Sequence, residues 1–388
     1  MSANDDTLKV NLYPMGNAFT RNPIFLTIFS SSMATYSIRM NNEEIFKGNG
    51  TGQFKVNIAE VVETGIKATA VLFDNTEVIT GITGAFARVD IHVENEGAEE
   101  TDLSFIAWTG GCSKKNFKRL RIMGTDIFTL KFLNPYCNFF FTTRSDDWKI
   151  TIRETELYPL SFIFPSSAEE VSITELTGMN KIILAGVPGN LYALDIAALR
   201  RTFFFNNGIL ASCFNVCVGK KIACRIAVEL SRVVKERYLL RFLNSYGAYE
   251  LLEVQGRASI TPQFPEEGEG TNFNRYDELT DDFSLERKRQ EIQNTITVGI
   301  GYRRRGEMPF LLDLISSDDV TLLGYGEEEI KVIPSAEELS FMVHPEEPKD
   351  FKIKLTFTEK ESNHTPDITE SGFSKPRVHS KQFDKQFN

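Results

Sequence analysis

The stretch Arg237-Tyr-Leu-Leu-Arg-Phe-Leu-Asn-Ser-Tyr-Gly-Ala-Tyr-Glu-Leu-Leu-Glu-Val-Gln-Gly256 carries the strongest local fold signal in the chain. Apolar and aromatic residues run from Tyr238 to Leu243 and again from Ala248 to Val254, with the polar segment Asn244–Gly247 between them. Two such runs around a turn that contains Asn and Gly are typical of a β-hairpin. The stretch holds no combination of residues suited to catalysis, so it predicts architecture rather than chemistry.

The rest of the chain repeats this pattern, with short apolar or alternating runs separated by turn residues about every eight to twelve positions. Phe is the dominant aromatic, with 31 residues against 11 Tyr and 2 Trp, and Phe suits strands and sheet interiors. We therefore predict a mainly β protein with several antiparallel β-sandwich-like domains and a few short helices. The clearest helix is expected at 194–205, and shorter ones at 113–120 and 308–316.

Composition divides the chain into four segments. We expect an N-terminal β-sandwich over residues 1–96, a central β-rich domain with the helix near 194–205 over residues 97–262, and a C-terminal β-rich domain over residues 263–359. The acidic, Gly-containing stretches 94–102 and 266–272 suggest the junctions. Residues 360–388 contain too few apolar side chains to fold alone, so a flexible arm is expected, free or ordered against a neighbouring subunit.

The charge balance narrows the classes of partner. The formal net charge is −10, which argues against nucleic acid because phosphate binding needs a concentrated basic surface. The N-terminus shows no secretory signal, and no apolar run is long enough for a transmembrane helix. We therefore expect a chain made in a host cytoplasm, with no membrane partner.

Motifs for metal or cofactor chemistry are missing from the sequence. The five cysteines include Cys213, Cys217 and Cys224, whose spacing differs from that of zinc sites, and their odd number suggests reduced thiols. Of the four histidines, His92 alternates with Ile91 and Val93 and is predicted to face solvent. Nucleotide-binding and nucleophile motifs are also absent. We predict no catalytic residues, no cofactor and no metal.

Part of the opening stretch also suggests kinship. The segment Arg241–Leu252 resembles a motif in structural proteins, tail or other virion components, of phages and prophages from Bacteroidetes hosts. Two further segments, Thr295–Ile300 with Pro309–Val320 and the strand Asp350–Phe357, look similar to parts of the same family. The resemblance implies a virion component, although Ala248 and Tyr249 replace the family's usual Gly and Trp after the turn.

The first functional hypothesis is a non-enzymatic structural subunit of a phage tail or phage-like particle. It would take part in virus assembly as a multi-copy oligomer, joined to copies of itself and to other virion or tail proteins through sheet edges, hairpin loops and the C-terminal arm. Its location would then be the virion tail. The candidate subunit contacts are Asn244, Tyr246 and Tyr249 of the hairpin and the isolated aromatics of the arm, Phe373, Phe383 and Phe387, the last of which precedes the terminal Asn388.

Two alternatives stay open. A carbohydrate-binding or adhesin-like β-sandwich protein would use surface aromatics such as Tyr246, Tyr249 and Trp148 to stack on a host-surface glycan. A glycosidase would need a pair of carboxylates held at the correct separation, for which Asp146 and Asp147 are the candidates. Adjacent acids are more often solvated loop residues, so the enzyme ranks last.

Overall fold

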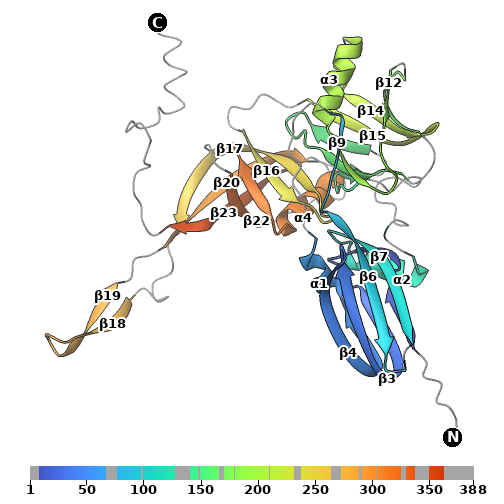
Figure 1. Ribbon diagram of the computed structural model, residues 1–388. Helices are drawn as coiled ribbons and strands as arrows, with labels where there is room; N and C mark the ends of the chain where they lie inside the picture. The colour runs from blue at the N-terminus through green and yellow to red at the C-terminus, as the bar shows by residue number, and fades with distance from the viewer. Residues whose placement is uncertain are drawn as a thin grey trace. The chain divides into compact units, whose positions relative to one another are not determined.

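The computed structural model describes residues 8–66, 77–97, 99–125, 127, 140–146, 149–165, 170–178, 180–208, 210–230, 237–263, 272–287, 291–303, 305–324, 329–336 and 349–361. Within these ranges strands predominate over four α-helices, which confirms the prediction of a mainly β fold with several sheets (Figure 1). The chain divides into two compact units, Met1–Ala258 with Thr297–Leu355, and Ser259–Ile296 with Thr356–Asn388. None of the helices described is long and apolar enough to cross a membrane.

The first unit begins with a six-stranded sheet, drawn in blue to cyan in Figure 1. Its strand order is β1 (Lys9–Tyr13), β3 (Phe25–Met40), β6 (Phe86–Asn95), β7 (Glu100–Trp108) and β2 (Gly16–Phe19), and β4 (Glu43–Asn57) also pairs with β3. One face of the sheet is a tightly buried aliphatic core that includes Ile38, Val89 and Ile91. The short helix α1 (Ala59–Thr64), which the sequence did not predict, adds Val62 to this core.

The acidic stretch 94–102, expected to be a domain junction, is the connection between two strands of this sheet. Strands β6 and β7 pair antiparallel from Phe86↔Trp108 to Glu94↔Glu100, so the sheet continues as far as Trp108. Gly and acidic residues suit a tight hairpin connection as well as a linker, and strand pairing is what distinguishes the two. The next element is α2 (Lys114–Met123), whose N-cap Ser113 accepts a hydrogen bond from the Asn116 amide.

Two sheets follow in the same unit. The larger has the order β12 (Lys181–Leu184), β11 (Val171–Glu175), β14 (Cys213–Val218), β15 (Lys221–Glu229), β9 (Lys149–Arg153) and β8 (Ser145–Asp146). The smaller has the order β10 (Leu160–Ile163), β13 (Leu191–Leu194) and β5 (Ile79–Gly81). Helix α3 (Ile196–Asn207), labelled in Figure 1, packs Leu199 and Phe203 into the core that these sheets share. It begins after the N-cap Asp195, whose carboxylate accepts a hydrogen bond from the Ala198 amide, and so starts two residues later than predicted.

The opening stretch forms the predicted hairpin, and the hairpin belongs to a closed barrel. Strands β16 (Arg237–Leu243) and β17 (Tyr249–Gln263) pair from Arg237↔Gln255 to Leu243↔Tyr249. The barrel order is completed by β20 (Ile292–Arg303), β23 (Lys349–Glu361), β22 (Ile330–Ser335) and β21 (Val320–Leu323). The turn η2 (Arg305–Glu307) leads into α4 (Met308–Ser316), which has the bounds predicted for it.

The second unit contains one hairpin that the sequence did not predict, β18 (Asn272–Asp277) with β19 (Asp282–Arg287). Its strands pair from Asn272↔Arg287 to Asp277↔Asp282. Strand β18 lacks apolar alternation, and in β19 only Phe283 and Leu285 alternate, a run too short to identify a strand. The expected arm at 360–388 lies almost entirely outside the described residues, as do the expected contacts Phe373, Phe383 and Phe387.

Candidate functional site

The outer face of the N-terminal sheet presents a polar surface. Along β6 the side chains alternate, so that Val89, Ile91 and Val93 are buried in the core whereas Arg88 and His92 lie on the opposite face. The alternation with Ile91 and Val93 predicts this position of His92, whose side chain is 32% exposed. Antiparallel pairing carries the polar face on to the neighbouring strands, because directly paired residues point to the same side.

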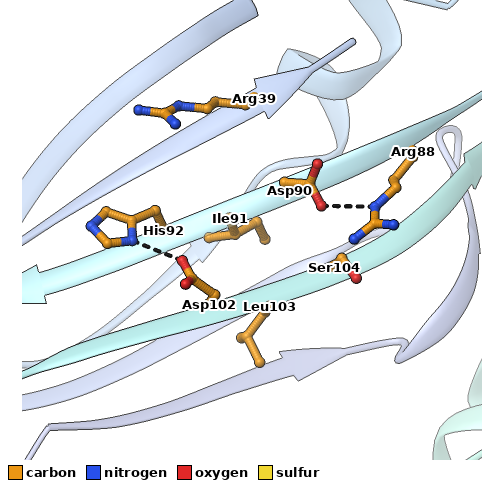
Figure 2. A pocket seen from close by; sticks show the side chains of 8 residues that line it. All are labelled: Arg39, Arg88, Asp90, Ile91, His92, Asp102, Leu103 and Ser104. Carbon is orange, nitrogen blue, oxygen red and sulfur yellow. Dashed lines mark hydrogen bonds and ion pairs between the residues drawn. The ribbon is translucent and has the colours of Figure 1, made fainter. Parts of the chain in front are cut away.

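A groove of about 530 Å³ lies on this face (Figure 2). Its lining combines two guanidinium groups, two carboxylates, an imidazole and a hydroxyl, from Arg39, Arg88, Asp90, Ile91, His92, Asp102, Leu103 and Ser104. The strand register explains how three strands supply these groups: Arg39 of β3 pairs with Asp90 of β6, and Asp90 pairs with Ser104 of β7. The groove is therefore built on strands rather than on loops, which holds its side chains in a defined order.

An ion pair and a hydrogen bond order the groove, and both are shown as dashed lines in Figure 2. Arg88 Nε donates to Asp90 Oδ1 at 2.9 Å, and His92 Nδ1 lies 2.8 Å from Asp102 Oδ1. An ionised carboxylate can only accept, so the shared hydrogen belongs to Nδ1. This leaves His92 Nε2 as the imidazole's acceptor when the ring is neutral, and it lies 3.9 Å from Glu94 Oε2.

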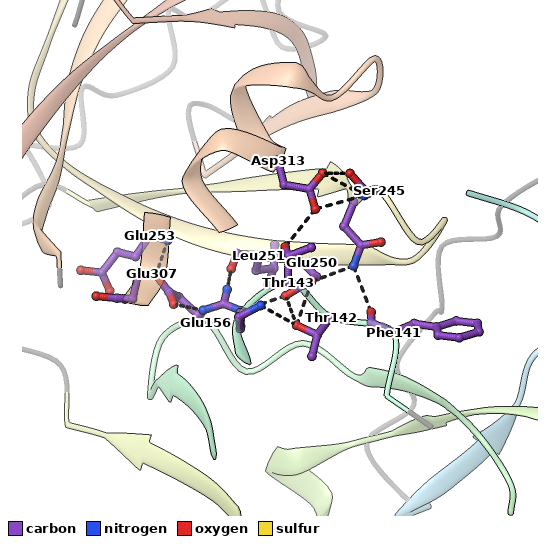
Figure 3. Close-up of polar contacts among 12 residues, drawn as sticks. Phe141, Thr142, Thr143, Glu156, Ser245, Glu250, Leu251, Glu253, Glu307 and Asp313 are labelled. Atoms are coloured by element: carbon purple, nitrogen blue, oxygen red, sulfur yellow. Dashed lines mark hydrogen bonds and ion pairs between the residues drawn. The ribbon is translucent and has the colours of Figure 1, made fainter. Parts of the chain in front are cut away.

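A second polar cluster, buried within the first unit, joins its sheets (Figure 3). Arg144 donates from Nη1 to Glu156 at 2.7 Å and from Nε to Glu250 at 2.9 Å, and Arg303 Nη2 donates to the other oxygen of Glu156 at 2.7 Å. The Arg144 guanidinium also lies over the Phe310 ring of α4, 3.9 Å from its centroid. All four charged side chains are nearly inaccessible to solvent, and buried charges of this kind are stable only when paired.

The carboxyl groups of this cluster respond differently to their surroundings. Burial alone raises the pKa of Glu156, but Arg303 and Arg144 together with their hydrogen bonds lower that pKa to about 2. Burial raises the pKa of Glu250, and Arg144, Asn244 and Thr142 offset only part of that rise. Glu156 between two arginines is therefore the firmly ionised centre of the cluster.

Asn244, expected at a subunit contact, is fully buried within its own chain. Its Nδ2 donates to the Phe141 carbonyl at 3.0 Å and to Glu250 at 2.7 Å, and its Oδ1 accepts from the amides of Tyr246 and Ala248, each at 3.0 Å. The side chain thus closes the hairpin turn and connects it to the buried charges. The structure gives Asn244 an internal role.

The two tyrosines expected beside it differ in their surroundings. Tyr246 is partly buried and packs against Phe19 and Phe141, with ring centroids 6.1 Å and 6.4 Å away. Tyr249 is half-buried and its hydroxyl donates to Asp319 Oδ2 at 2.6 Å. Burial, reinforced by neighbouring carboxylates, raises the pKa of both phenols, so both stay neutral donors. Of the other residues expected in a glycan or glycosidase site, Asp146 lies in strand β8, whereas Asp147 and Trp148 lie outside the described residues.

The structure therefore brings together residues that no sequence motif connected. Arg144, Glu156, Glu250 and Arg303 are separated by up to 159 positions and carry no shared spacing. The sequence gives a weak indication of the pair His92 and Asp102. The two residues lie at equal distances from a hairpin connection, so a correctly predicted strand register would place them opposite each other.

Comparison with known proteins finds no matching family model and no matching curated protein. Among solved structures, a 1.5-MDa bacterial ice-binding adhesin is 10% identical and has a TM-score of 0.16, covering 76% of this chain and 93% of that chain. A Ca²⁺-stabilised ice-binding adhesin of an Antarctic bacterium is also 10% identical, with a TM-score of 0.16 and coverage of 76% and 70%.

A third structure is SGBP-B of the Bacteroides ovatus mixed-linkage glucan utilization locus, solved with a mixed-linkage heptasaccharide. It is 8% identical with a TM-score of 0.17, and covers 77% of this chain and 65% of that chain. These three are adhesins and a glycan-binding protein, and the expected phage proteins are not among them. At such TM-scores the likeness carries no argument about function, which has to come from the site itself.

Proposed function

We propose that this chain is a non-enzymatic, adhesin-like β protein that binds a hydroxyl-rich glycan in the groove on the outer face of its N-terminal sheet. The observation that carries the proposal is the lining of the groove, in which strong donors from Arg39 and Arg88 alternate with acceptors from Asp90 and Asp102. A sugar hydroxyl both donates and accepts, so a surface that offers both roles at short spacing suits it.

The proposed mode of recognition is polar. No Phe, Tyr or Trp is among the described residues that line the groove, so the ring stacking common in sugar sites contributes nothing there. Tyr246, named above for a stacking role, packs against Phe19 and Phe141 of its own chain. A single polar groove of this kind gives modest affinity, and several linked copies would raise the overall affinity through multivalency.

The carboxylates of the groove support binding better than hydrolysis. A glycosidase needs one carboxylic acid kept protonated by apolar surroundings and a second carboxylate facing it. Asp90 accepts from Arg88, and the Asp102 side chain is 83% exposed and pairs with His92. Neither carboxylate therefore has the apolar surroundings that such an acid needs.

A glycan array followed by calorimetric titration of the strongest binder tests the proposal. We expect Arg39→Ala to weaken binding about tenfold or more, because a hydrogen bond from a charged donor contributes about 1.5–3 kcal/mol. Arg119→Ala is the matched control, since Arg119 is an exposed arginine on α2 outside the groove. An array without binders, or affinity unchanged by Arg39→Ala, would contradict the proposal.

A place in a phage tail stays a separate prediction that rests on the sequence resemblance alone. Two of the residues expected to join subunits, Asn244 and Tyr246, make internal contacts here, so they add no support to it. Electron microscopy of particles purified with the protein tests the prediction. A glycan-binding protein carried on such a particle would satisfy both hypotheses.

A further inference from the structure

Four polar side chains, called the block below, lie together at the end of the β6–β7 hairpin. His92 is paired directly with Asp102, and Glu94 is paired directly with Glu100. Residues two apart on a strand share a face, so all four lie on the outer face of the sheet. One ligand atom from each of His92, Glu94 and Glu100 lies within 4.8 Å of the others.

The tautomer of His92 is already the one that a metal ligand needs. Asp102 holds the hydrogen on Nδ1, so the lone pair of Nε2 is free on the side where Glu94 Oε2 lies 3.9 Å away. A carboxylate that hydrogen-bonds the far nitrogen of an imidazole orients the ring and raises its basicity toward a metal ion. Asp102 is therefore a positioning residue, distinct from the three ligands.

The two neighbouring glutamates of the block would be stabilised by a bound cation. Like charges that face each other directly across two strands are destabilising, and Glu94 and Glu100 are such a pair. Within the described parts of the chain, neither of these two carboxylates forms an ion pair with a lysine or arginine, and Glu94 meets only the His92 ring. A divalent ion between them would replace this repulsion with attraction.

We propose that His92, Glu94 and Glu100 bind a divalent transition-metal ion of the Zn²⁺ class. Zinc takes ligands at about 2.0–2.2 Å, and exposed glutamates can rotate to close the remaining distance. One imidazole with two carboxylates suits Zn²⁺ or Co²⁺, whereas Ca²⁺ prefers six to eight oxygens. Three protein ligands leave a fourth position open to water or to a ligand group. The proposal does not depend on glycan binding, although His92 also lines the groove.

Titration calorimetry with ZnCl₂ on the EDTA-treated protein tests the site, and no glycan is present. We expect one ion per chain and no saturable binding of CaCl₂. His92→Ala and Glu100→Gln each remove a ligand and should weaken Zn²⁺ binding by more than tenfold. Asp102→Asn keeps all three ligands and should still weaken binding about 10- to 100-fold, as loss of an orienting carboxylate does.

Glu44→Gln is the matched control, because Glu44 is an exposed carboxylate of the same sheet outside the block. Circular dichroism confirms that each variant is folded. Absent Zn²⁺ binding, or equal weak binding of Zn²⁺ and Ca²⁺ that His92→Ala leaves unchanged, would show an exposed acidic cluster only and overturn the proposal. Arg39→Ala, which tests the glycan groove, should leave Zn²⁺ affinity intact, so the two proposals fail separately.

Discussion

Asn244 satisfies four separate hydrogen-bonding groups from one fully buried position. We expect Asn244→Ala to lower the free energy of unfolding by about 4 kcal/mol or more, because four partner groups are left unpaired at about 1–3 kcal/mol each. Urea denaturation measures the loss. Asn49→Ala, at an exposed strand position, is the control and should change stability by less than about 0.5 kcal/mol. An equal effect in both variants would refute the internal role of Asn244.

Glu156 gives a pH-dependent prediction at the same scale. Its folded pKa of about 2 lies below the ordinary value of 4.5, so its ionised form stabilises the protein above pH 4.5. That contribution, about 3 kcal/mol, is lost as the pH falls from 4.5 through 2. We expect Glu156→Gln to be less stable than the wild type at pH 7 by about this amount.

The check for Glu156→Gln is urea denaturation at a series of pH values. The gap between wild type and variant should be constant from pH 7 to pH 5 and should narrow below pH 4.5. A gap that stays constant down to pH 3 would mean that the charge of Glu156 does not stabilise the fold.

At the scale of elements, the turn of the opening hairpin docks against residues 109–111, which follow β7. The Gly111 amide donates to the Ser245 carbonyl at 2.6 Å. A side chain at Gly110 would place its Cβ 2.3 Å from the Tyr246 carbonyl carbon and 2.7 Å from the Gly247 nitrogen. The two backbones approach so closely that Gly110 is required for packing as well as for its φ of +103°.

Gly110→Ala should therefore destabilise the protein by more than about 3 kcal/mol, as strain and overpacking combine. Gly124→Ala is a matched control, because Gly124 also has a positive φ, of 63°, but open space where a Cβ would lie. The control should cost about 1 kcal/mol, from strain alone. Thermal unfolding compares the two, and similar melting temperatures would contradict the docking contact.

At the scale of the whole molecule, we expect the hairpin β18–β19, which belongs to the second unit, to contribute little to the stability of the first unit. The polar contacts described within it are local, such as Ser284 Oγ donating to the Arg275 carbonyl at 3.3 Å, and Leu279 and Phe283 are exposed. Replacing residues 264–290 with a two-residue Asn-Gly turn should leave the melting temperature of the first unit within about 2 °C. A fall of more than about 5 °C, measured by calorimetry, would show that the hairpin supports the barrel.

Local order was predictable because it depends on neighbours in the chain. Alternation of apolar residues and a turn with Asn and Gly predicted strands β16 and β17, and apolar spacing with a following stop predicted α3 and α4. The position of His92 on an outer face followed from the same alternation. The mainly β class needed nothing beyond composition and spacing.

Only the tertiary structure decided what these elements do. Strand register, which pairs distant residues, produces the closure of the barrel and the groove on β3, β6 and β7. It also brings together His92, Glu94 and Glu100 of the proposed metal site. The turn Asn244–Gly247 makes contacts within its own chain, because Asn244 donates to Glu250 of the buried charged cluster. The charged side chains of that cluster, Arg144, Glu156, Glu250 and Arg303, are stable in the interior only as a paired set. A single sequence does not show that pairing, since the energy of a buried charge depends on partners that the fold alone brings within reach.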